Sequence, residues 1–260
     1  MKYFIPTLLV IVFILTGCKK NTGKKIAFIE ANTMNMIFKK PTVTFITETL
    51  GLTHCESVVY DKNRGIIYAS LIGNKKVVDG SIAKVGLDGK LIDATFVANL
   101  NDPKGIAITK DKLYVSDVTK LVEVDLETGQ ILKKYTLEGI KFLNDVALDN
   151  NGNVFVSDTS TSKIYRLDSQ GNFSLWLAND LLDRPNGLLI QDDTMYVASW
   201  GKKPEGGRVS KIDMATKTID TITSVIGNLD GIRVYDKKQM IISDWRSGNI
   251  HLVDDKGNTE

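Results

Sequence analysis

The sequence predicts an all-β protein of the β-propeller class, and three observations support this prediction. Short runs rich in Val, Ile, Tyr and Phe alternate with turns of Asn, Asp and Gly. No stretch keeps the 3.6-residue apolar period of an amphipathic helix, so helices should be rare. A pattern of two apolar runs recurs five times at spacings of 40–48 residues, which suits a four-stranded propeller blade.

The five repeats share one order: a polar residue, a small residue in most cases, an apolar run, a turn, and a second apolar run that ends in Ser or Asp. They span residues 56–70, 104–117, 144–158, 186–199 and 230–244. A third run follows, then a turn with Gly and, in most repeats, a fourth run. A β-helix has shorter units, and a sandwich would not repeat this punctuation five times.

Two features lie at the ends of the repeat array. Residues 43–47 form one early strand, which we expect to complete the last blade and close the ring. The fifth repeat stops inside a turn at residues 257–260, before a fourth strand. Residues 43–260 therefore hold about five blades, so a six-bladed ring would need roughly one more blade of about 40–50 residues. We expect a chain truncated at its C-terminus.

Composition and charge restrict the class of protein. With 43% hydrophobic and 25% charged residues among 260, the chain is an ordinary globular one. Two cysteines exclude a disulfide framework and a multi-cysteine zinc module. The net charge of +2 comes from the first 40 residues, which leave 26 of the 33 bases and 30 of the 31 acids to the remainder. A mildly acidic propeller, expected as a monomer, gives no reason to expect nucleic-acid binding.

The N-terminus looks like a leader. Residues 4–15 are almost wholly apolar, too short to span a membrane as a helix and right for a signal peptide. Leu15-Thr-Gly-Cys18 follows and resembles a bacterial lipobox. We expect a signal peptide at 1–17, lipidated Cys18, a tether over 18–42 and the propeller over 43–260. The location is then the cell envelope, at the outer membrane or a periplasmic face. An ordinary signal peptide with a chance cysteine is the alternative.

The first positions of the five repeats are the candidate site. The innermost strand of a blade begins at the central channel, so equivalent positions converge around one axis. The residues there are Glu56, Lys104, Asn144, Asn186 and Asp230. All of them except Lys104 offer oxygen donors. Two carboxylates and two amide oxygens suit a hard cation such as Ca²⁺ or Mg²⁺. The alternative is that the Asn-Gly and Asp-Gly pairs at 186 and 230 are turn residues only.

Four motifs resemble the SMP-30/gluconolactonase/LRE-like family of six-bladed propellers over about residues 43–260. They are Glu56-Ser-Val-Val-Tyr-Asp, Phe142-Leu-Asn-Asp-Val-Ala-Leu-Asp, Arg184-Pro-Asn-Gly-Leu and Leu229-Asp-Gly-Ile. The resemblance implies that Glu56, Asn186 and Asp230 bind one divalent cation, Ca²⁺ first, with Mg²⁺, Mn²⁺ or Zn²⁺ as alternatives. It also implies that Asn144 joins this set or contacts the substrate, and that enzymes of the family hydrolyse lactones or other esters.

The chemistry is consistent with those residues. A cation polarises a lactone carbonyl and activates water, and Asp230 can accept the proton that the water gives up. Asn144 would support this step as the second catalytic candidate. No Gly-x-Ser-x-Gly motif is present, so a serine hydrolase is not expected. His54, two residues before Glu56, is the weaker candidate for a catalytic group.

The chain departs from the family at two positions. The sugar-lactone enzymes carry Glu-Gly-Pro where this chain has Glu56-Ser-Val, and an Arg where this chain has Phe142. Phe142 suits a substrate less polar than a sugar, or else packs within its loop. Lys104 either binds a substrate carboxylate or neutralises the ring of oxygen donors.

Other residues in register have structural and functional alternatives. Trp200 and Trp245 either line the mouth of the channel or pack between blades. Acceptors that stabilise turns are expected at Asp117, Asp158 and Asp244, and Cys55 should be buried and inert. The alternative to a hydrolase is a non-catalytic propeller lipoprotein that binds a ligand or partner and holds a structural calcium ion.

Overall fold

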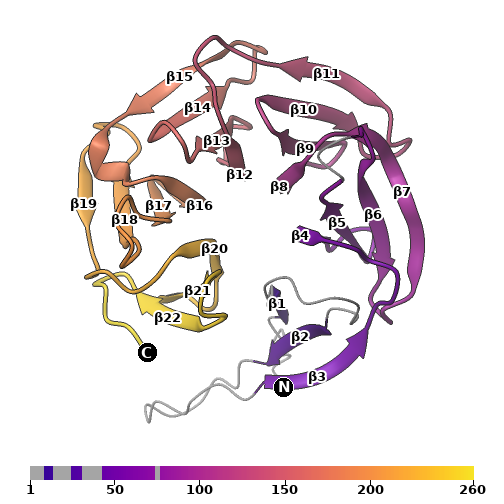
Figure 1. The fold of residues 1–260 in the computed structure, drawn as a ribbon, viewed down its shortest axis with the longest axis horizontal. Helices are drawn as coiled ribbons and strands as arrows, with labels where there is room; N and C mark the ends of the chain where they lie inside the picture. Colours follow the sequence, from indigo (N-terminus) through magenta and orange to yellow (C-terminus); the bar gives the residue numbers. More distant parts are fainter. Residues whose placement is uncertain (1–8, 14–24, 31–42, 74–76) are drawn as a thin grey trace, which may run out of the picture.

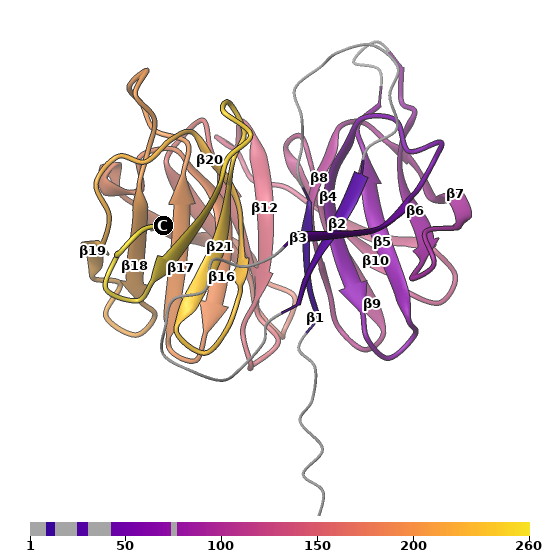
Figure 2. The same ribbon diagram turned by 90° about the horizontal axis from the view of Figure 1, so that it is seen from below.

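The computed structural model describes residues 9–13, 25–30, 43–73 and 77–260, and shows the predicted all-β fold. Five antiparallel sheets stand around a central channel like the blades of a propeller (Figure 1). Seen from the side, the innermost strands run along the channel and the outer strands face solvent (Figure 2). In these ranges the only helical element is the three-residue turn η1 (Asp180–Leu182). The prediction of five blades and few helices is confirmed.

Each blade is built from strands consecutive in sequence, numbered outward from the channel. Blade one holds β4 (Cys55–Asp61), β5 (Ile66–Leu71), β6 (Gly80–Gly86) and β7 (Leu91–Leu100). Blade two holds β8 (Pro103–Ile108), β9 (Lys112–Asp117), β10 (Lys120–Asp125) and β11 (Ile131–Tyr135). Blade three holds β12 (Leu143–Leu148), β13 (Val154–Asp158), β14 (Lys163–Leu167) and β15 (Phe173–Ala178). Blade four holds β16 (Pro185–Gln191), β17 (Thr194–Ser199), β18 (Val209–Asp213) and β19 (Ile219–Thr221). Blade five holds β20 (Leu229–Val234), β21 (Gln239–Asp244) and β22 (Ile250–Asp254).

The core lies between blades rather than within one sheet. Tyr68 and Ile82 of blade one, for example, pack against Ile106, Leu113 and other residues of blade two. Similar clusters join blades two and three, three and four, and four and five. Because both faces of a sheet are covered by neighbouring blades, the middle strands read as continuous apolar runs instead of alternating ones. This packing explains the repeated apolar runs of the sequence.

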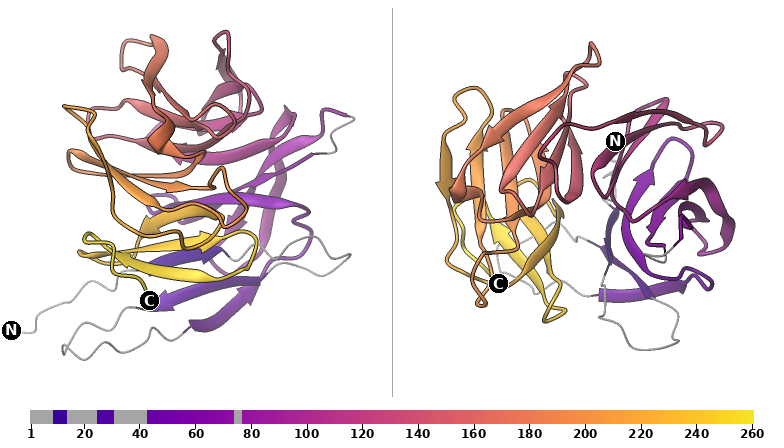
Figure 3. Two further views of the ribbon diagram at one scale, coloured as in Figure 1. Left: turned by 60° about the vertical axis from the view of Figure 1, so that its left-hand side comes forward. Right: turned by 45° about the horizontal axis from the view of Figure 1, so that its top comes forward.

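A sixth, smaller sheet occupies the gap between blades five and one (Figures 1 and 3). It consists of β1 (Leu9–Phe13), β2 (Lys25–Glu30) and β3 (Val43–Glu48), with β2 in the middle. We expected residues 43–47 to complete the last blade and close the ring. β3 does not join blade five, because it pairs with β2, but its sheet fills the gap between blades five and one (Figure 1). The hydrogen-bonding edge of β3 is occupied by β2. β1 lies inside the predicted signal peptide. Removal of this peptide and truncation of the chain at its C-terminus both stay predictions.

Blade five ends with the beginning of an outer strand. The chain turns after β22, and the backbone of Glu260 exchanges two hydrogen bonds with Leu252, at 2.9 and 3.0 Å. Thr259 also forms an antiparallel bridge with Val253. The last residues therefore start to cover the outer edge of β22, in the position that a fourth strand takes in the other blades.

Candidate functional site

A β-bulge marks the start of the innermost strand in every blade. The pairing register between the first and second strands shifts next to each predicted first position: between Cys55 and Val58, Pro103 and Ile106, Leu143 and Val146, Pro185 and Gly187, and Leu229 and Ile232. A bulge leaves residues unpaired in the ladder and re-aims their side chains, and bulges are common next to active sites. The five first-position residues therefore share one backbone feature at one end of the channel.

Serines near the end of the second strand satisfy the backbone of these bulges. The Oγ atoms of Ser70, Ser157 and Ser243 accept hydrogen bonds from the N–H groups of Ser57, Asp145 and Gly231, at 2.9–3.0 Å. The hydroxyl of Ser157 also donates to the carbonyl of Asn186 in the next blade, at 2.7 Å. In blades one, three and five, the serine near the end of the second strand thus replaces the ladder partner that the bulge removes.

Glu56 and Asp230 are two carboxyl groups at the bulged starts of β4 and β20, and the charge of Asp230 acts on Glu56. Burial raises the pKa of Glu56 to about 8, and repulsion by Asp230 adds to this rise while the Lys104 cation opposes it. Burial also raises the pKa of Asp230 to about 6, with a further rise from Asp145 and an opposing hydrogen bond from Asn186. Two carboxyl groups that resist ionisation side by side are a place where a cation is favoured.

The two predicted asparagines are buried in blades three and four, and Asn186 contacts Asp230. Asn186 is 3% exposed, and its Nδ2 donates to Oδ1 of Asp230 at 2.8 Å. Asn144 is 7% exposed, and its Nδ2 donates to Oγ1 of Thr159 at 3.3 Å. Because each amide nitrogen is engaged, the remaining Oδ1 atoms are the groups that can accept from water or bind a cation.

Lys104 is buried and already has partners. Its Nζ lies 3.2 Å from Oδ1 of Asp102 and 5.1 Å from the centre of the Phe142 ring. The two predicted substrate residues, Lys104 and Phe142, are therefore in contact across blades two and three. Asp102, which the sequence analysis did not single out, supplies the counter-charge. Phe142 thus provides an aromatic face to a cation at the channel.

The sequence analysis also missed an ion pair between blades three and five. Asp145 is buried, and its Oδ2 accepts from the backbone of Leu188 at 2.9 Å and lies 3.3 Å from Nη1 of Arg233. A signal was present in the repeats. The position after each first residue is Ser or Gly in the other four blades, so Asp145 is the one charged residue in that register.

The structure decides most of the remaining alternatives. Asp117, Asp158 and Asp244 each accept two or more backbone N–H groups from the loops beside them, as predicted. Trp200 and Trp245 contact each other between blades four and five, with ring centres 5.4 Å apart. Packing between blades is therefore confirmed, although Trp245 stays 45% exposed.

The remaining reactive residues lie in less suggestive places. Cys55 is buried, as predicted, next to Ala69 and Leu71. His54 is exposed, and His251 lies on the third strand of blade five, away from the innermost strand. Cys18, the predicted lipidation site, lies outside the described residues. In the part of the chain that the structure describes, no helix is long and apolar enough to cross a bilayer.

The donor set suits a hard cation in chemical type. Within residues 44–73 and 77–260, no three His, Cys, Asp or Glu side chains gather closely enough for a site made of such ligands alone. The candidate set instead combines two carboxylates, Glu56 and Asp230, with the amide oxygens of Asn144 and Asn186. Calcium accepts such mixed oxygen ligands and completes its shell with water. Burial is the main cause that raises the pKa of both carboxyls, so the chain alone favours their neutral forms and a bound cation would favour the ionised ones.

Comparison with known proteins shows the fold. No protein-family model and no curated protein matches the sequence. A chain of the nidogen/laminin complex is 17% identical with a TM-score of 0.74, over 95% of this chain and 89% of that one. A gluconolactonase from Xanthomonas campestris is 18% identical with a TM-score of 0.63, over 82% and 77%. Virginiamycin B lyase from Staphylococcus aureus is 12% identical with a TM-score of 0.62, over 98% and 88%. At these identities the likeness extends to the propeller fold alone, which such different proteins share.

Proposed function

We propose that this protein is a divalent-cation-dependent hydrolase of lactones or related esters. One observation carries the proposal: Glu56 and Asp230 stand at the bulged starts of β4 and β20, the charge of Asp230 raises the pKa of Glu56, and Asn186 is hydrogen-bonded to Asp230. The likeness to a solved gluconolactonase and the family motifs point in the same direction. Calcium is the first candidate for the cation.

The residues of the chain have distinct roles in this proposal. Glu56, Asp230, Asn186 and Asn144 would hold the cation, which when bound polarises the ester carbonyl. Asn186 fixes one oxygen of Asp230 by its 2.8 Å hydrogen bond, so the second oxygen is free to accept a proton from the attacking water.

The substrate should be less polar than a sugar lactone. Phe142 stands where the sugar-lactone enzymes carry an Arg, and its ring faces Lys104 instead of a solvated hydroxyl partner. Lys104 is engaged with Asp102, which reduces its availability for a substrate carboxylate. We infer that neutral lactones or esters with an apolar substituent fit better than charged, polyhydroxylated ones.

The proposal is tested by metal analysis of the purified full chain and a panel of alkyl lactones, sugar lactones and aryl esters, with and without chelator. We expect turnover that chelation abolishes and Ca²⁺ restores. Glu56→Gln and Asp230→Asn should lower kcat/KM at least ~100-fold, since each removes a charge that acts at the reacting centre. Glu138→Gln and Asp192→Asn, which lie outside the channel in exposed turns, are the matched controls.

Equal turnover in wild type and both channel variants would overturn the proposal. Ligand binding that survives chelation without turnover would favour the non-catalytic propeller instead. A large loss of thermal stability on chelation, again without turnover, would assign the cation a structural role.

We also propose that Cys18 is lipidated and anchors the propeller to an envelope membrane. The support is the apolar run followed by Leu15-Thr-Gly-Cys18. Cleavage before Cys18 would remove β1 from the mature chain. In a bacterial host, the wild type should fractionate with membranes and incorporate labelled palmitate, and Cys18→Ser should do neither. Membrane association of Cys18→Ser equal to wild type would contradict the anchor.

A further inference from the structure

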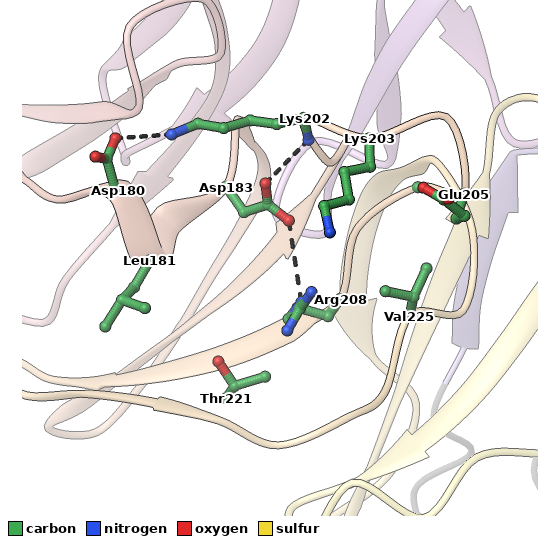
Figure 4. Close-up of a pocket in the computed structure, with 10 residues that line it drawn as sticks. Asp180, Leu181, Asp183, Lys202, Lys203, Glu205, Arg208, Thr221 and Val225 are labelled. Carbon is green, nitrogen blue, oxygen red and sulfur yellow. Dashed lines mark hydrogen bonds and ion pairs between the residues drawn. The ribbon is translucent and has the colours of Figure 1, made fainter.

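A hollow lies on blade four, outside the channel (Figure 4). Its volume is about 470 Å³, within the range of small-molecule sites. The lining comes from η1, from the loop between β17 and β18, from β19 and from the segment after it. Pro185 at the start of β16 pairs with Ser199 at the end of β17, so the hollow opens at the same end of the blade as the channel mouth.

Glycines hold the loop of this hollow in one compact shape. Gly201 and Gly206 have φ values of +89° and +105°, and a Cβ atom on either would lie within 2.4 Å of another backbone atom. Gly207 donates to the carbonyl of Gly227 at 2.7 Å, which ties the loop to the segment before blade five. Such close backbone packing needs glycine and presents the intervening side chains from a fixed frame.

The charged side chains that line the hollow differ in how completely they are paired. Lys202 is neutralised by Asp180 at 2.7 Å, and its backbone N–H donates to Asp183. Arg208 lies 3.9 Å from Asp183, too far for a hydrogen bond, and its buried Nε donates to no atom of the described chain. Among residues 43–73 and 77–260, Lys203 forms no ion pair.

Two cationic groups therefore face one space with donors to spare. Figure 4 shows Lys203 and Arg208 lining the same hollow, with Asp183 paired to Arg208. Asp183 offsets part of this positive charge, but at 3.9 Å it leaves the Nε of Arg208 without a hydrogen bond. Glu205 also lines the hollow; it is exposed and forms no ion pair with described residues.

Apolar side chains complete the wall. Leu181 is 56% exposed and Val225 is 39% exposed, and both face this hollow. Exposed branched aliphatic residues beside the side chains of Lys203 and Arg208 offer a place for a short hydrocarbon chain. The polar and apolar parts are thus adjacent rather than mixed.

We propose that this hollow binds a small organic carboxylate. The carboxylate group lies between Lys203 and Arg208, and the short apolar part covers Leu181 and Val225. Arg offers paired N–H donors that match a carboxylate, and Lys supplies a second, mobile donor. The site is independent of the channel, because it shares no residue with the set around Glu56 and Asp230.

Calorimetric titration of the full chain with hexanoate tests the proposal, with hexanamide and inorganic phosphate as the other probes. We expect saturable hexanoate binding with a Kd on the order of 1 mM, as for a weak small-fragment site. Hexanamide should bind at least ~10-fold more weakly, because it lacks the charge that the two cations attract. Lys203→Ala and Arg208→Gln should each weaken hexanoate binding at least ~5-fold, whereas Lys238→Ala, on a distant hairpin, should not change it.

Two further measurements fix the place of binding. Hexanoate should bind Lys104→Ala as it binds wild type, since a carboxylate in the channel would depend on Lys104 instead. Amide resonances of residues 202–208 should shift during the titration. Absence of saturable binding, or unchanged affinity in Lys203→Ala, would overturn the site. Phosphate that binds as tightly as hexanoate through the same two cations would overturn the apolar half of the proposal.

Discussion

Asp145 and Arg233 belong to blades three and five, yet their side chains meet at 3.3 Å across the blade that separates them. Asp145 also accepts the backbone N–H of Leu188 in blade four. One carboxylate thus joins three successive blades at the channel. Asp145 is buried, while Arg233 is partly exposed. We therefore expect the ion pair to affect stability mainly because it compensates the buried negative charge of Asp145.

Arg233→Met should destabilise the protein by about 1–3 kcal/mol, because it leaves a buried negative charge without its cation. Asp145→Asn keeps an acceptor for Leu188 but removes the charge, and the double variant should recover part of the loss. A double-mutant cycle from urea unfolding measures this coupling, expected at about 0.5–2 kcal/mol. Strict additivity of the two single changes would show that the ion pair contributes nothing.

Ser157→Ala should cost about 1–3 kcal/mol and reduce activity several-fold. The hydroxyl accepts from the N–H of Asp145 and donates to the carbonyl of Asn186, so alanine leaves two buried backbone groups unsatisfied. The backbone of Asn186 should then shift relative to Asp230. Thermal unfolding and kcat/KM are the measurements, and Ser169→Ala, in an exposed turn, is the control. A variant as stable and as active as that control would refute the role of the serine.

The metal-free protein should lose stability as the pH rises from about 5 to 8. Glu56 and Asp230 have folded-state pKa values raised from 4.5 to about 8 and from 3.8 to about 6. The folded state therefore holds protons that the unfolded state has already released, and this contribution disappears as the pH passes through the folded-state values. Solvent at the channel mouth reduces the effect, so we expect a loss of about 1–3 kcal/mol.

Thermal unfolding between pH 5 and pH 8 measures this slope. Glu56→Gln, which cannot ionise, should flatten most of it. Added Ca²⁺ should restore stability mainly at the higher pH, because a cation favours the deprotonated carboxylates. A slope that is the same in wild type and Glu56→Gln would show that Glu56 does not titrate in this window.

The sequence was sufficient to predict features that repeat. The bulged first positions and the serines and aspartates that close the second strands share one register, so five weak signals reinforced one another. Asp145 was not predicted, because it differs from the other repeats at the second position and not at the first position that the candidate residues share. Its partner, Arg233, lies 88 residues away, and no local pattern indicates such a contact.

Features without a repeat were predicted less well. The strand at residues 43–47 was predicted correctly, but its partner β2, at residues 25–30, lies in a segment that was interpreted as a tether. For a similar reason, the sequence left open whether Lys104 binds a substrate carboxylate or neutralises the ring of oxygen donors. Its engagement by Asp102 and Phe142 depends on how blades two and three face each other.

Phe142 should control which esters the channel accepts. Its ring faces the Lys104 ammonium at 5.1 Å, at a position where the sugar-lactone enzymes have an Arg. Phe142→Ala should raise KM for alkyl lactones about 5–20-fold with a smaller effect on kcat, because it removes apolar surface that binds ground state and transition state alike. Phe142→Tyr, which keeps the ring, should stay close to wild type. Steady-state kinetics on alkyl and sugar lactones separate the two substrate classes. If the alanine variant loses kcat instead, with KM unchanged, Phe142 acts on the reacting groups, and its assignment to substrate selection is wrong.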